Sequence, residues 1–417
     1  MESIADRLSR VSALRPRSHA IHRSSSQADQ LIQQLGGEKH TNILGCHNVV
    51  RRQFSEPRAK EMSVQALRFL APGAEESVRD TQQWLFLDVE TTGLAGGTGT
   101  YAFLVGLAWW EESSFVVEQY FMRDHGEESS LLMGLLEHFD RRSVLVTFNG
   151  KSFDWPLLQT RYQMNRVGKV RPPLIHLDLL YPSRQLWRLQ LESVALTQLE
   201  RHVLKLQRGQ DIPSERIPQT YFDFLRGGPP ELMAEVFRHN QLDLCGLAFL
   251  AMHISNLLAD PENRSCCANE LFGISRLAQK RGDQKLAIRT YGKALQGGLS
   301  KPAEQIALRE LALLAKRNRD FPLSNAFWEK LLGDTVEGLK AYEQLAIYYE
   351  RYAKLPQKAA LLVREALAKL QESFRAGRID PSKYMRLHAQ FQHRLARLSI
   401  KFANSRQPQP PANSLRE

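Results

Sequence analysis

The feature that most constrains the fold is a pair of acidic residues at the end of a short apolar run. Residues 84–88 are mostly apolar, and the acids Asp88 and Glu90 are two positions apart. Side chains at i and i+2 of a strand point to the same face, so we expect these carboxylates side by side at the rim of a sheet. Like charges held there repel each other and raise at least one carboxyl pKa. A divalent cation such as Mg²⁺ or Mn²⁺ removes the repulsion, because it takes oxygen ligands, and pairs of such ions serve phosphoryl chemistry.

The order of apolar and helical segments predicts an α/β domain over residues 81–260. Three meandering strands followed by crossovers predict a five-stranded mixed sheet with helices on both faces. The expected strands are residues 84–88, 101–110, 115–121, 143–148 and 174–179, and the expected helices are residues 127–139, 153–164 and 231–258. Residues 1–80 show little periodicity and are interpreted as a basic, partly flexible N-terminal region, with an organelle transit peptide as the alternative.

A second candidate segment follows the fourth expected strand. Asp154 opens the next helix, where an acid also interacts favourably with the helix dipole. Asn149 tolerates turn geometry, and Lys151 is either a phosphate contact or a solvated lysine. Phe153 and Trp155 are candidates for base stacking, although aromatic residues at such positions are more often part of a core.

These segments resemble the motifs of the DEDD exonuclease superfamily of ribonuclease H-like proteins. A bare D-x-E is compatible with a solvated strand end, but D-x-E-T-T-G at residues 88–93 resembles the first exonuclease motif, and N-x-x-x-F-D at residues 149–154 is similar to the second. The resemblance implies a 3'-5' exonuclease that uses two Mg²⁺ or Mn²⁺ ions. It assigns the metal to Asp88, Glu90, Asp154 and Asp243, and nucleic-acid contacts to Thr91, Thr92, Leu94, Asn149 and Lys151.

The third segment departs from that family pattern. His239 and Asp243 are four positions apart on the long expected helix and therefore share one face. The histidine subgroup places its histidine five positions before the aspartate, where this chain has Arg238, and the tyrosine subgroup places its tyrosine four positions before. His239 is a candidate base for the attacking water. The alternative is a packed or surface histidine.

Further features resemble the bacterial YprB-type ribonuclease H-like proteins, over roughly residues 80–370. They are the hybrid H-N-x-x-D, the glycine-rich residues 96–100, Asp211-Ile-Pro, Ile217-Pro and a repeat-like C-terminal region. Residues 96–100 lack the Gly-Lys-[Ser/Thr] of a nucleotide P-loop, so a flexible turn is expected there. Asp178, at the end of the fifth expected strand, either orients a ligand or caps a turn.

Residues 264–370 are rich in Ala, Leu, Lys and Glu, and an all-α domain is predicted over residues 264–400. Small and apolar residues recur at offsets of 37 and 34 positions, from Ser275 to Ala312 and from Ala312 to Ala346. This spacing resembles tetratricopeptide repeats, and an ordinary helical bundle is the alternative. Residues 401–417 contain a Pro- and Gln-rich stretch and are expected to be disordered.

Charge and cysteine usage narrow the class of partner. The net charge is +11, and residues 141–210 alone hold 12 Lys and Arg against 4 Asp and Glu. This basic window fits a polyphosphate partner, DNA or RNA, single-stranded or at an end; a solvated basic surface is the alternative. The four cysteines include no C-x-x-C pair, so a zinc site is not expected and a reducing cytoplasm fits best. The sequence has no uninterrupted run of about 18 apolar residues, so a membrane span is not expected.

The combined expectation is a metal-dependent nuclease that hydrolyses phosphodiesters at a nucleic-acid end. Its rival is a catalytically inactive nucleic-acid-binding or scaffold protein that binds a protein partner through its helical repeats. A related endonuclease is a second rival.

Overall fold

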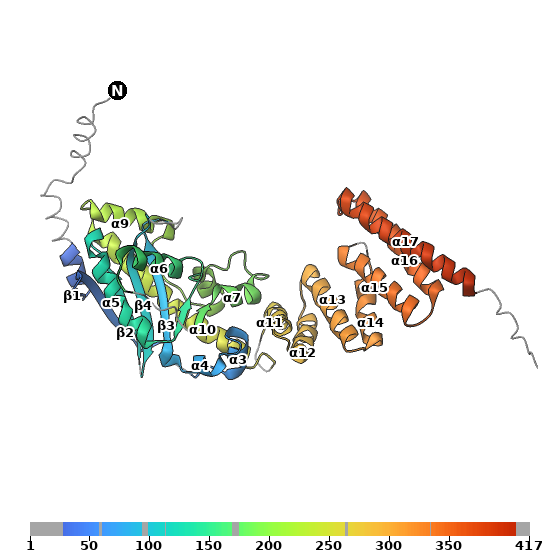
Figure 1. The fold of residues 1–417 in the computed structure, drawn as a ribbon, viewed down its shortest axis with the longest axis horizontal. Coiled ribbons are helices and arrows are strands. Elements are labelled where there is room, and N and C mark those ends of the chain that lie inside the picture. Colours follow the sequence, from blue (N-terminus) through green and yellow to red (C-terminus); the bar gives the residue numbers. More distant parts are fainter. Residues whose placement is uncertain are drawn as a thin grey trace, which may run out of the picture. The chain divides into compact units, whose positions relative to one another are not determined.

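The computed structural model describes residues 28–57, 61–93, 99–112, 114–168, 175–262, 266–333 and 335–405. The chain divides into two compact units, which we call unit 1 (Met1–Cys266) and unit 2 (Cys267–Glu417). Unit 1 contains the sheet, and in the described residues unit 2 is entirely helical apart from its loops (Figure 1).

Unit 1 is built on a seven-stranded mixed sheet. The strand order is β1-β2-β5-β4-β3-β6-β7; β6 pairs in parallel with β3 and β7, and the other neighbours are antiparallel. The strands are β1 (Glu38–Asn42), β2 (Gly45–Phe54), β3 (Trp84–Thr91), β4 (Ala102–Glu111), β5 (Ser114–Phe121), β6 (Val144–Thr147) and β7 (Ile175–Asp178). The five strands expected from the sequence are β3 to β7, and the ribonuclease H-like α/β class is confirmed.

The expected strand number was wrong because β1 and β2 lie within the region interpreted as a basic N-terminal arm. β2 pairs with β5 over Asn48 to Phe54, and the Arg51 guanidinium lies 2.7 Å from the Glu118 carboxylate of β5. Polar and charged residues on both sides of β2 hide the alternation that identifies a strand. β1 pairs with one side of β2, but its other side is paired by β5, which is distant in sequence, so tertiary contact decides where β2 joins the sheet. Residues 1–27 and 58–60 lie outside the described part of the chain.

Helices cover both faces of the sheet, and adjacent residues of β5 show this alternation. Gln119 donates a hydrogen bond to Asn240 of α10 (Pro230–Ala259), whereas the Tyr120 ring and His47 face Gly134 of α5 (Glu128–Arg141). The other helices of unit 1 are α3 (Val64–Leu70), α4 (Glu75–Arg79), α6 (Asp154–Asn165), α7 (Leu180–Trp187), α8 (Leu196–Leu199) and α9 (Ile217–Leu225), with short turns η1 (Thr81–Gln83), η2 (His125–Glu127), η3 (Glu200–Leu204) and η4 (Ser214–Arg216).

Helix α10 is long and apolar enough to cross a membrane by length and composition alone. Of its most apolar stretch, 56% is buried, and the helix packs against β3, β4 and β5. Its polar residues Asn240 and Asp243 lie beside β3, as described below. These contacts are those of a core helix.

Unit 2 consists of consecutive helices that pack as neighbouring pairs. They are α11 (Ala268–Lys280), α12 (Gln284–Gln296), α13 (Lys301–Arg317), α14 (Phe321–Leu331), α15 (Val336–Arg351), α16 (Pro356–Arg375) and α17 (Pro381–Ser405). The closest packing is within the pairs α11–α12, α13–α14 and α15–α16, with α17 against α16. The all-α class of this region is confirmed, and its assignment to tetratricopeptide repeats stays a prediction.

Two aspartates at matching positions begin the second helix of a pair. Asp283 accepts a hydrogen bond from the Leu286 amide, and Asp320 accepts one from the Leu323 amide. Both are N-caps, which satisfy amides that have no partner inside the helix. At the C-terminus α17 continues to Ser405, so residues 401–405 are helical where disorder was expected; residues 406–417 lie outside the described part.

Candidate active site

Strand β3 places the two acids of the first motif on the face that is covered by α10. Asp88 is paired with Gly106 of β4, and Glu90 with Leu104. Both side chains keep some contact with solvent but lie deep among protein atoms. The Asp88 carboxylate Oδ2 accepts a hydrogen bond of 2.7 Å from Asn240 Nδ2 on α10. The strand end therefore presents two carboxylates side by side, as their spacing predicted.

The fold brings all four acids of the expected metal site within range of mutual repulsion. Burial, and then the charges of Asp243, Glu90 and Asp154, raises the pKa of Asp88 well above its usual range. Burial and the charges of Asp243, Asp154 and Asp211 do the same to Glu90. Burial also raises the pKa of Asp154, to about 7. These residues come from β3, α6 and α10, so the negative field exists only in the folded chain.

A glycine and a glutamine fix the position of Asn240. A Cβ atom on Gly106 would lie 2.2 Å from Asn240 Oδ1, so only glycine lets α10 come this close to β4. Gln119 Nε2 donates to Asn240 Oδ1 at 2.9 Å and to the Phe237 carbonyl at 2.7 Å. With its oxygen occupied, the Asn240 amide directs its nitrogen at Asp88. Sequence reasoning missed this series of hydrogen bonds. The signal that could have found it is Gly106, because a glycine inside an apolar strand often marks the close approach of another element.

The loop before α6 is held by Asp178 at the end of β7. Asp178 accepts hydrogen bonds from the amides of Asn149 (2.8 Å), Lys151 (3.1 Å) and Leu180 (3.1 Å). Asn149 has φ +67°, the left-handed conformation that asparagine tolerates. Asp178 thus caps the turn that leads to Asp154, which was one of the two roles considered for it.

The side chains around Asp154 divide into exposed and core residues. Lys151 is exposed, and Phe153 has 55% of its surface exposed. Trp155 is buried, with its ring centroid 5.3 Å from that of Phe139. Of the two aromatic residues considered for base stacking, only Phe153 is therefore accessible.

The residues after Glu90 form a hydrogen-bonded turn. The Thr91 hydroxyl donates to the Gly93 carbonyl at 2.8 Å, and the Thr92 hydroxyl accepts from the Tyr101 amide at 2.9 Å. Both hydroxyls therefore shape the turn beside the carboxylates. Leu94, and most of the glycine-rich stretch expected to be a flexible turn, lie outside the described residues.

Asp243 is close to an arginine that sequence reasoning did not single out. Arg208 Nη2 lies 2.5 Å from Asp243 Oδ1 and 2.6 Å from Glu200 Oε1, and Arg208 Nη1 lies 3.1 Å from Asp211 Oδ2. Gly246 on α10 makes room for this arrangement, because a Cβ there would lie 1.7 Å from Glu200 Oε1. The Arg208 guanidinium is thus the positive charge nearest to Asp243.

The segment that carries Arg208 is tied to α10 through its backbone. Arg238 Nη1 donates to the Gln210 carbonyl at 2.7 Å, and Nη2 donates to the Arg208 carbonyl at 2.8 Å. Arg238 occupies the position where the family pattern has its histidine. In this protein the Arg238 side chain anchors the loop at Arg208 and Gln210 and does not serve as a base.

His239 is buried between two carboxylates. Its Nδ1 lies 2.9 Å from Asp211 Oδ1, and its Nε2 lies 3.5 Å from both Asp243 Oδ2 and the Ser214 hydroxyl. Only 4% of its surface is exposed. The geometry fits a histidine that orients Asp243, and agrees with the packed-histidine alternative rather than with direct access to a water.

The donor atoms fit a hard divalent cation, but their arrangement does not yet form a closed ligand set. Across the described part of the chain, no three His, Cys, Asp or Glu side chains lie close enough together to hold one ion as they stand. Asp243 Oδ1 is buried against the Arg208 guanidinium, whose Nη2 lies 2.5 Å away. Carboxylate oxygens in a repulsive field are suitable ligands for Mg²⁺ or Mn²⁺. The Arg208 guanidinium therefore competes with an ion for Asp243 Oδ1.

Comparison with known proteins identifies the family. Residues 85–255 match the family model of the RNase H superfamily. Over 327 residues the chain is 31% identical to the uncharacterized protein YprB of Bacillus subtilis (strain 168), and the match covers 76% of this chain and 75% of YprB. The two resemblances seen in the motifs, to ribonuclease H-like proteins and to YprB, are thereby confirmed. The chain belongs to the RNase H superfamily and, within it, to the family of YprB.

Proposed function

We propose that this protein is a metal-dependent nuclease, a 3'-5' exonuclease that hydrolyses phosphodiesters with two Mg²⁺ or Mn²⁺ ions. The observation that supports this most strongly is the set of acids around the end of β3, in which burial and mutual repulsion raise the pKa values of Asp88, Glu90 and Asp154. Such a field is costly unless cations compensate it. Membership of the RNase H superfamily supports a nuclease-type function and binding of nucleic acid. The polarity of digestion rests on the motif resemblance alone.

In this proposal Asp88, Glu90, Asp154 and Asp243 hold the ions. When bound, the ions supply Lewis-acid chemistry that activates water and stabilises charge on the phosphate. Asn240 keeps the Asp88 carboxylate turned toward the site. His239, which lies between Asp211 and Asp243, orients Asp243.

The substrate is proposed to approach over the loop that precedes α6. Lys151 is exposed there and offers a cation to a phosphate, and the exposed ring of Phe153 offers a stacking surface for a terminal base. Thr91, Thr92 and Asn149 shape the adjoining turns, so their backbone groups are the proposed contacts to the substrate end.

One observation favours the rival function, a catalytically inactive nucleic-acid-binding or scaffold protein that binds a partner through its helices. The Arg208 guanidinium neutralises Asp243 at 2.5 Å without a metal. If that ion pair persisted under all conditions, Asp243 Oδ1 would stay unavailable to an ion. The rival then retains nucleic-acid binding without turnover.

A nuclease panel separates these functions. Labelled single- and double-stranded DNA and RNA, linear and circular, are incubated with the wild type and with Asp88→Ala in Mg²⁺, Mn²⁺ or EDTA. The proposal expects metal-dependent shortening of linear strands that Asp88→Ala abolishes. Cleavage of circles would indicate an endonuclease. Binding without cleavage in either metal would support the inactive rival, and equal activity of Asp88→Ala would remove Asp88 from the mechanism.

A further inference from the structure

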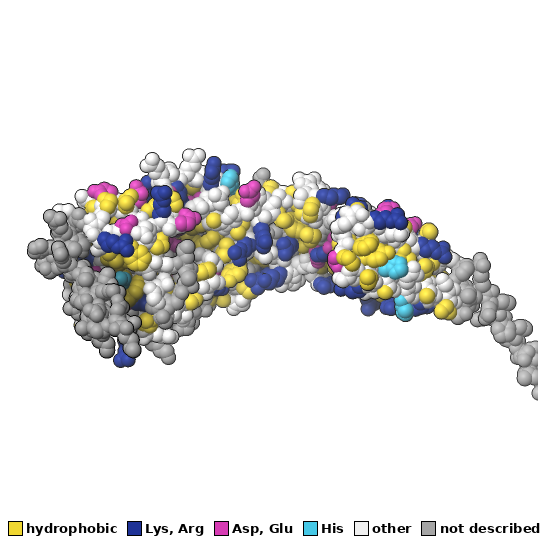
Figure 2. Space-filling model, turned by 90° about the horizontal axis from the view of Figure 1, so that it is seen from above, with side chains coloured by type: hydrophobic (Ala, Val, Ile, Leu, Met, Phe, Trp, Pro, Cys, Tyr) yellow, Lys and Arg dark blue, Asp and Glu magenta, His cyan; other side chains and the backbone are white. Residues whose placement is uncertain are grey.

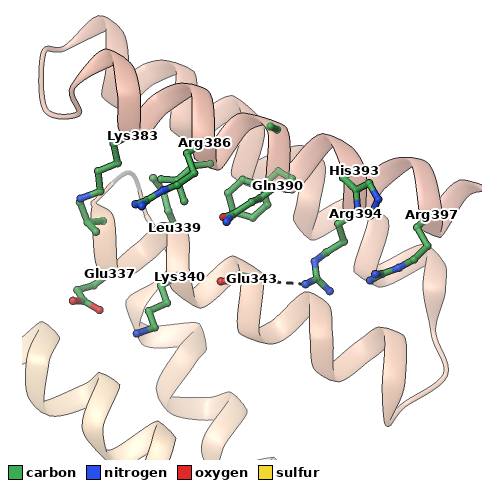
Figure 3. A pocket seen from close by; sticks show the side chains of 14 residues that line it. Glu337, Leu339, Lys340, Glu343, Lys383, Arg386, Gln390, His393, Arg394 and Arg397 are labelled. Atoms are coloured by element: carbon green, nitrogen blue, oxygen red, sulfur yellow. Dashed lines mark ion pairs between the residues drawn. The ribbon is translucent and has the colours of Figure 1, made fainter.

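Unit 2 contains a groove between α15 and α17 that is distant in sequence from the carboxylates of unit 1. Its volume is about 680 Å³. Figure 3 shows the side chains of α17 on one side and those of α15 on the other, with Gln390 between them.

One wall of the groove carries a row of cations. Between Pro381 and Ser405, α17 has five Lys and Arg residues and no Asp or Glu. Lys383, Arg386, Arg394 and Arg397 line the groove, so they share one face of the helix. At a rise of about 1.5 Å per residue, the row extends for roughly 21 Å. In the space-filling view of Figure 2, Lys, Arg and His side chains lie among exposed hydrophobic ones on unit 2.

Carboxylates in and beneath the groove do not balance this row. Glu350, of whose side chain 2% is exposed, pairs with Arg394 (3.1 Å), Arg397 (2.7 Å) and Lys401 (2.8 Å). One carboxylate therefore serves three cations. Of the groove's other acids, Glu337 lies 2.6 Å from Arg309, outside the groove, and Glu343 lies 3.9 Å from Arg394.

The cations near the other end of the groove have weaker compensation. Within the described part of the chain, Lys340, Lys383 and Arg386 form no ion pair within 4.0 Å, although Lys340 is close enough to Glu310 of α13 for their charges to interact. Between these cations the floor is apolar: Leu387 is partly exposed, and Leu339 and Phe391 are buried beneath it. The groove thus combines a cationic rim with an apolar floor, a combination that suits a polyanion with flat apolar groups.

We propose that this groove binds the phosphodiester backbone of single-stranded nucleic acid, with phosphates at Lys383 and Arg386 and the apolar faces of bases or sugars over Leu387. The choice of nucleic acid over an acidic peptide rests on the proposed function and on the apolar floor. A single strand offers flat base faces beside its phosphates, whereas an acidic side chain ends in charge alone. The groove lets unit 2 retain a strand independently of the carboxylates.

Binding is tested without catalysis. Full-length Asp88→Ala protein in EDTA is titrated against fluorescein-labelled oligothymidylate and oligouridylate, and anisotropy is followed at several salt concentrations. Lys383→Gln/Arg386→Gln in the same background removes two groove cations. Arg364→Gln/Arg375→Gln removes two exposed cations of α16 outside the groove and is the matched control. Circular dichroism checks that each variant keeps its helical content.

We expect the groove variant to bind more weakly than the control and to show a shallower salt dependence. Each phosphate contact to a single strand contributes about 0.7 to the slope of log K against log salt, so two lost contacts reduce it by about 1.4. Equal affinity and slope in the groove variant and the parent would overturn the proposal. So would tighter binding of duplex than of single strands, or displacement of the strand by polyglutamate at lower charge concentration than by unlabelled oligothymidylate.

These results are independent of turnover. Groove-dependent binding by a protein without nuclease activity would leave the groove proposal standing and the nuclease proposal refuted. Nuclease activity, together with unchanged strand binding by the groove variant, would support the nuclease proposal and refute the groove proposal.

Discussion

Replacing Asp154 with asparagine tests whether the folded site penalises an ionised carboxylate at this position. Burial, aided by repulsion from Asp178 and Asp243 and opposed by a backbone hydrogen bond, raises the pKa of Asp154 from 3.8 to about 7. With about 1.4 kcal/mol for each pKa unit, this difference destabilises the ionised folded state by roughly 4 kcal/mol. Asparagine cannot ionise and is not subject to that penalty.

The sign of the pH dependence follows from which state binds the proton more tightly. The folded chain holds the Asp154 proton up to a pH of about 7, whereas the unfolded chain releases it near 3.8. The contribution of Asp154 to metal-free stability is therefore fully present below pH 3.8 and is lost as the pH rises through 7. In EDTA we expect the free energy of unfolding of Asp154→Asn to exceed that of the wild type by up to about 4 kcal/mol at about pH 8. At about pH 4 the two free energies should differ little.

Urea unfolding in EDTA across this pH range measures the difference. Tryptophan fluorescence reports mainly on unit 1, because five of the six tryptophans lie there. Asp140→Asn, at an exposed carboxylate of α5, is the matched control and should change stability by no more than about 0.5 kcal/mol. Added Mg²⁺ should stabilise the wild type more than Asp154→Asn, because it binds the folded state. Equal pH profiles of wild type and Asp154→Asn in EDTA would refute the argument that the folded chain penalises the ionised form of Asp154.

Three further changes test other parts of the site. Arg208→Gln should raise Mn²⁺ affinity by roughly tenfold in calorimetry, because Asp243 loses its guanidinium partner; weaker binding would show that Arg208 supports the site. Gly106→Ala should cost about 1–3 kcal/mol in urea unfolding, because its Cβ would lie 2.2 Å from Asn240 Oδ1. Gly292→Ala, which has open space on α12, is its control and should not destabilise. Lys151→Ala should raise KM for oligonucleotides in steady-state assays with kcat and stability unchanged; a fall in kcat alone would contradict a binding role.

Much of the site was predictable because its parts are local. The apolar run before Asp88, the turn at Asn149 and the spacing of His239 and Asp243 are properties of short segments, and each forms the strand, turn or helix that was expected. The relation between these segments was predictable only through family resemblance. Strand β2 was missed, because its two adjacent valines are followed by two arginines and a glutamine, which leaves no regular alternation to detect.

The surroundings of the acids depend on long-range contacts. Asn240 reaches Asp88 across 152 positions, and Gln119 reaches Asn240 across 121. Arg208 meets Asp243 and Glu200 only because Gly246 leaves space on α10. None of these pairs shares a periodicity or a motif that a reader of the sequence could connect.

By itself, then, the sequence determined the fold class, the acids and their carrier elements, since residues two or four positions apart share a face whatever surrounds them. Only the tertiary structure decided that a seven-stranded sheet is formed, that Asp88 is held by Asn240, and that Asp243 is paired with Arg208. The physical reason is that hydrogen bonds, ion pairs and burial act over a few ångströms in space, and the chain brings these residues together only when it folds.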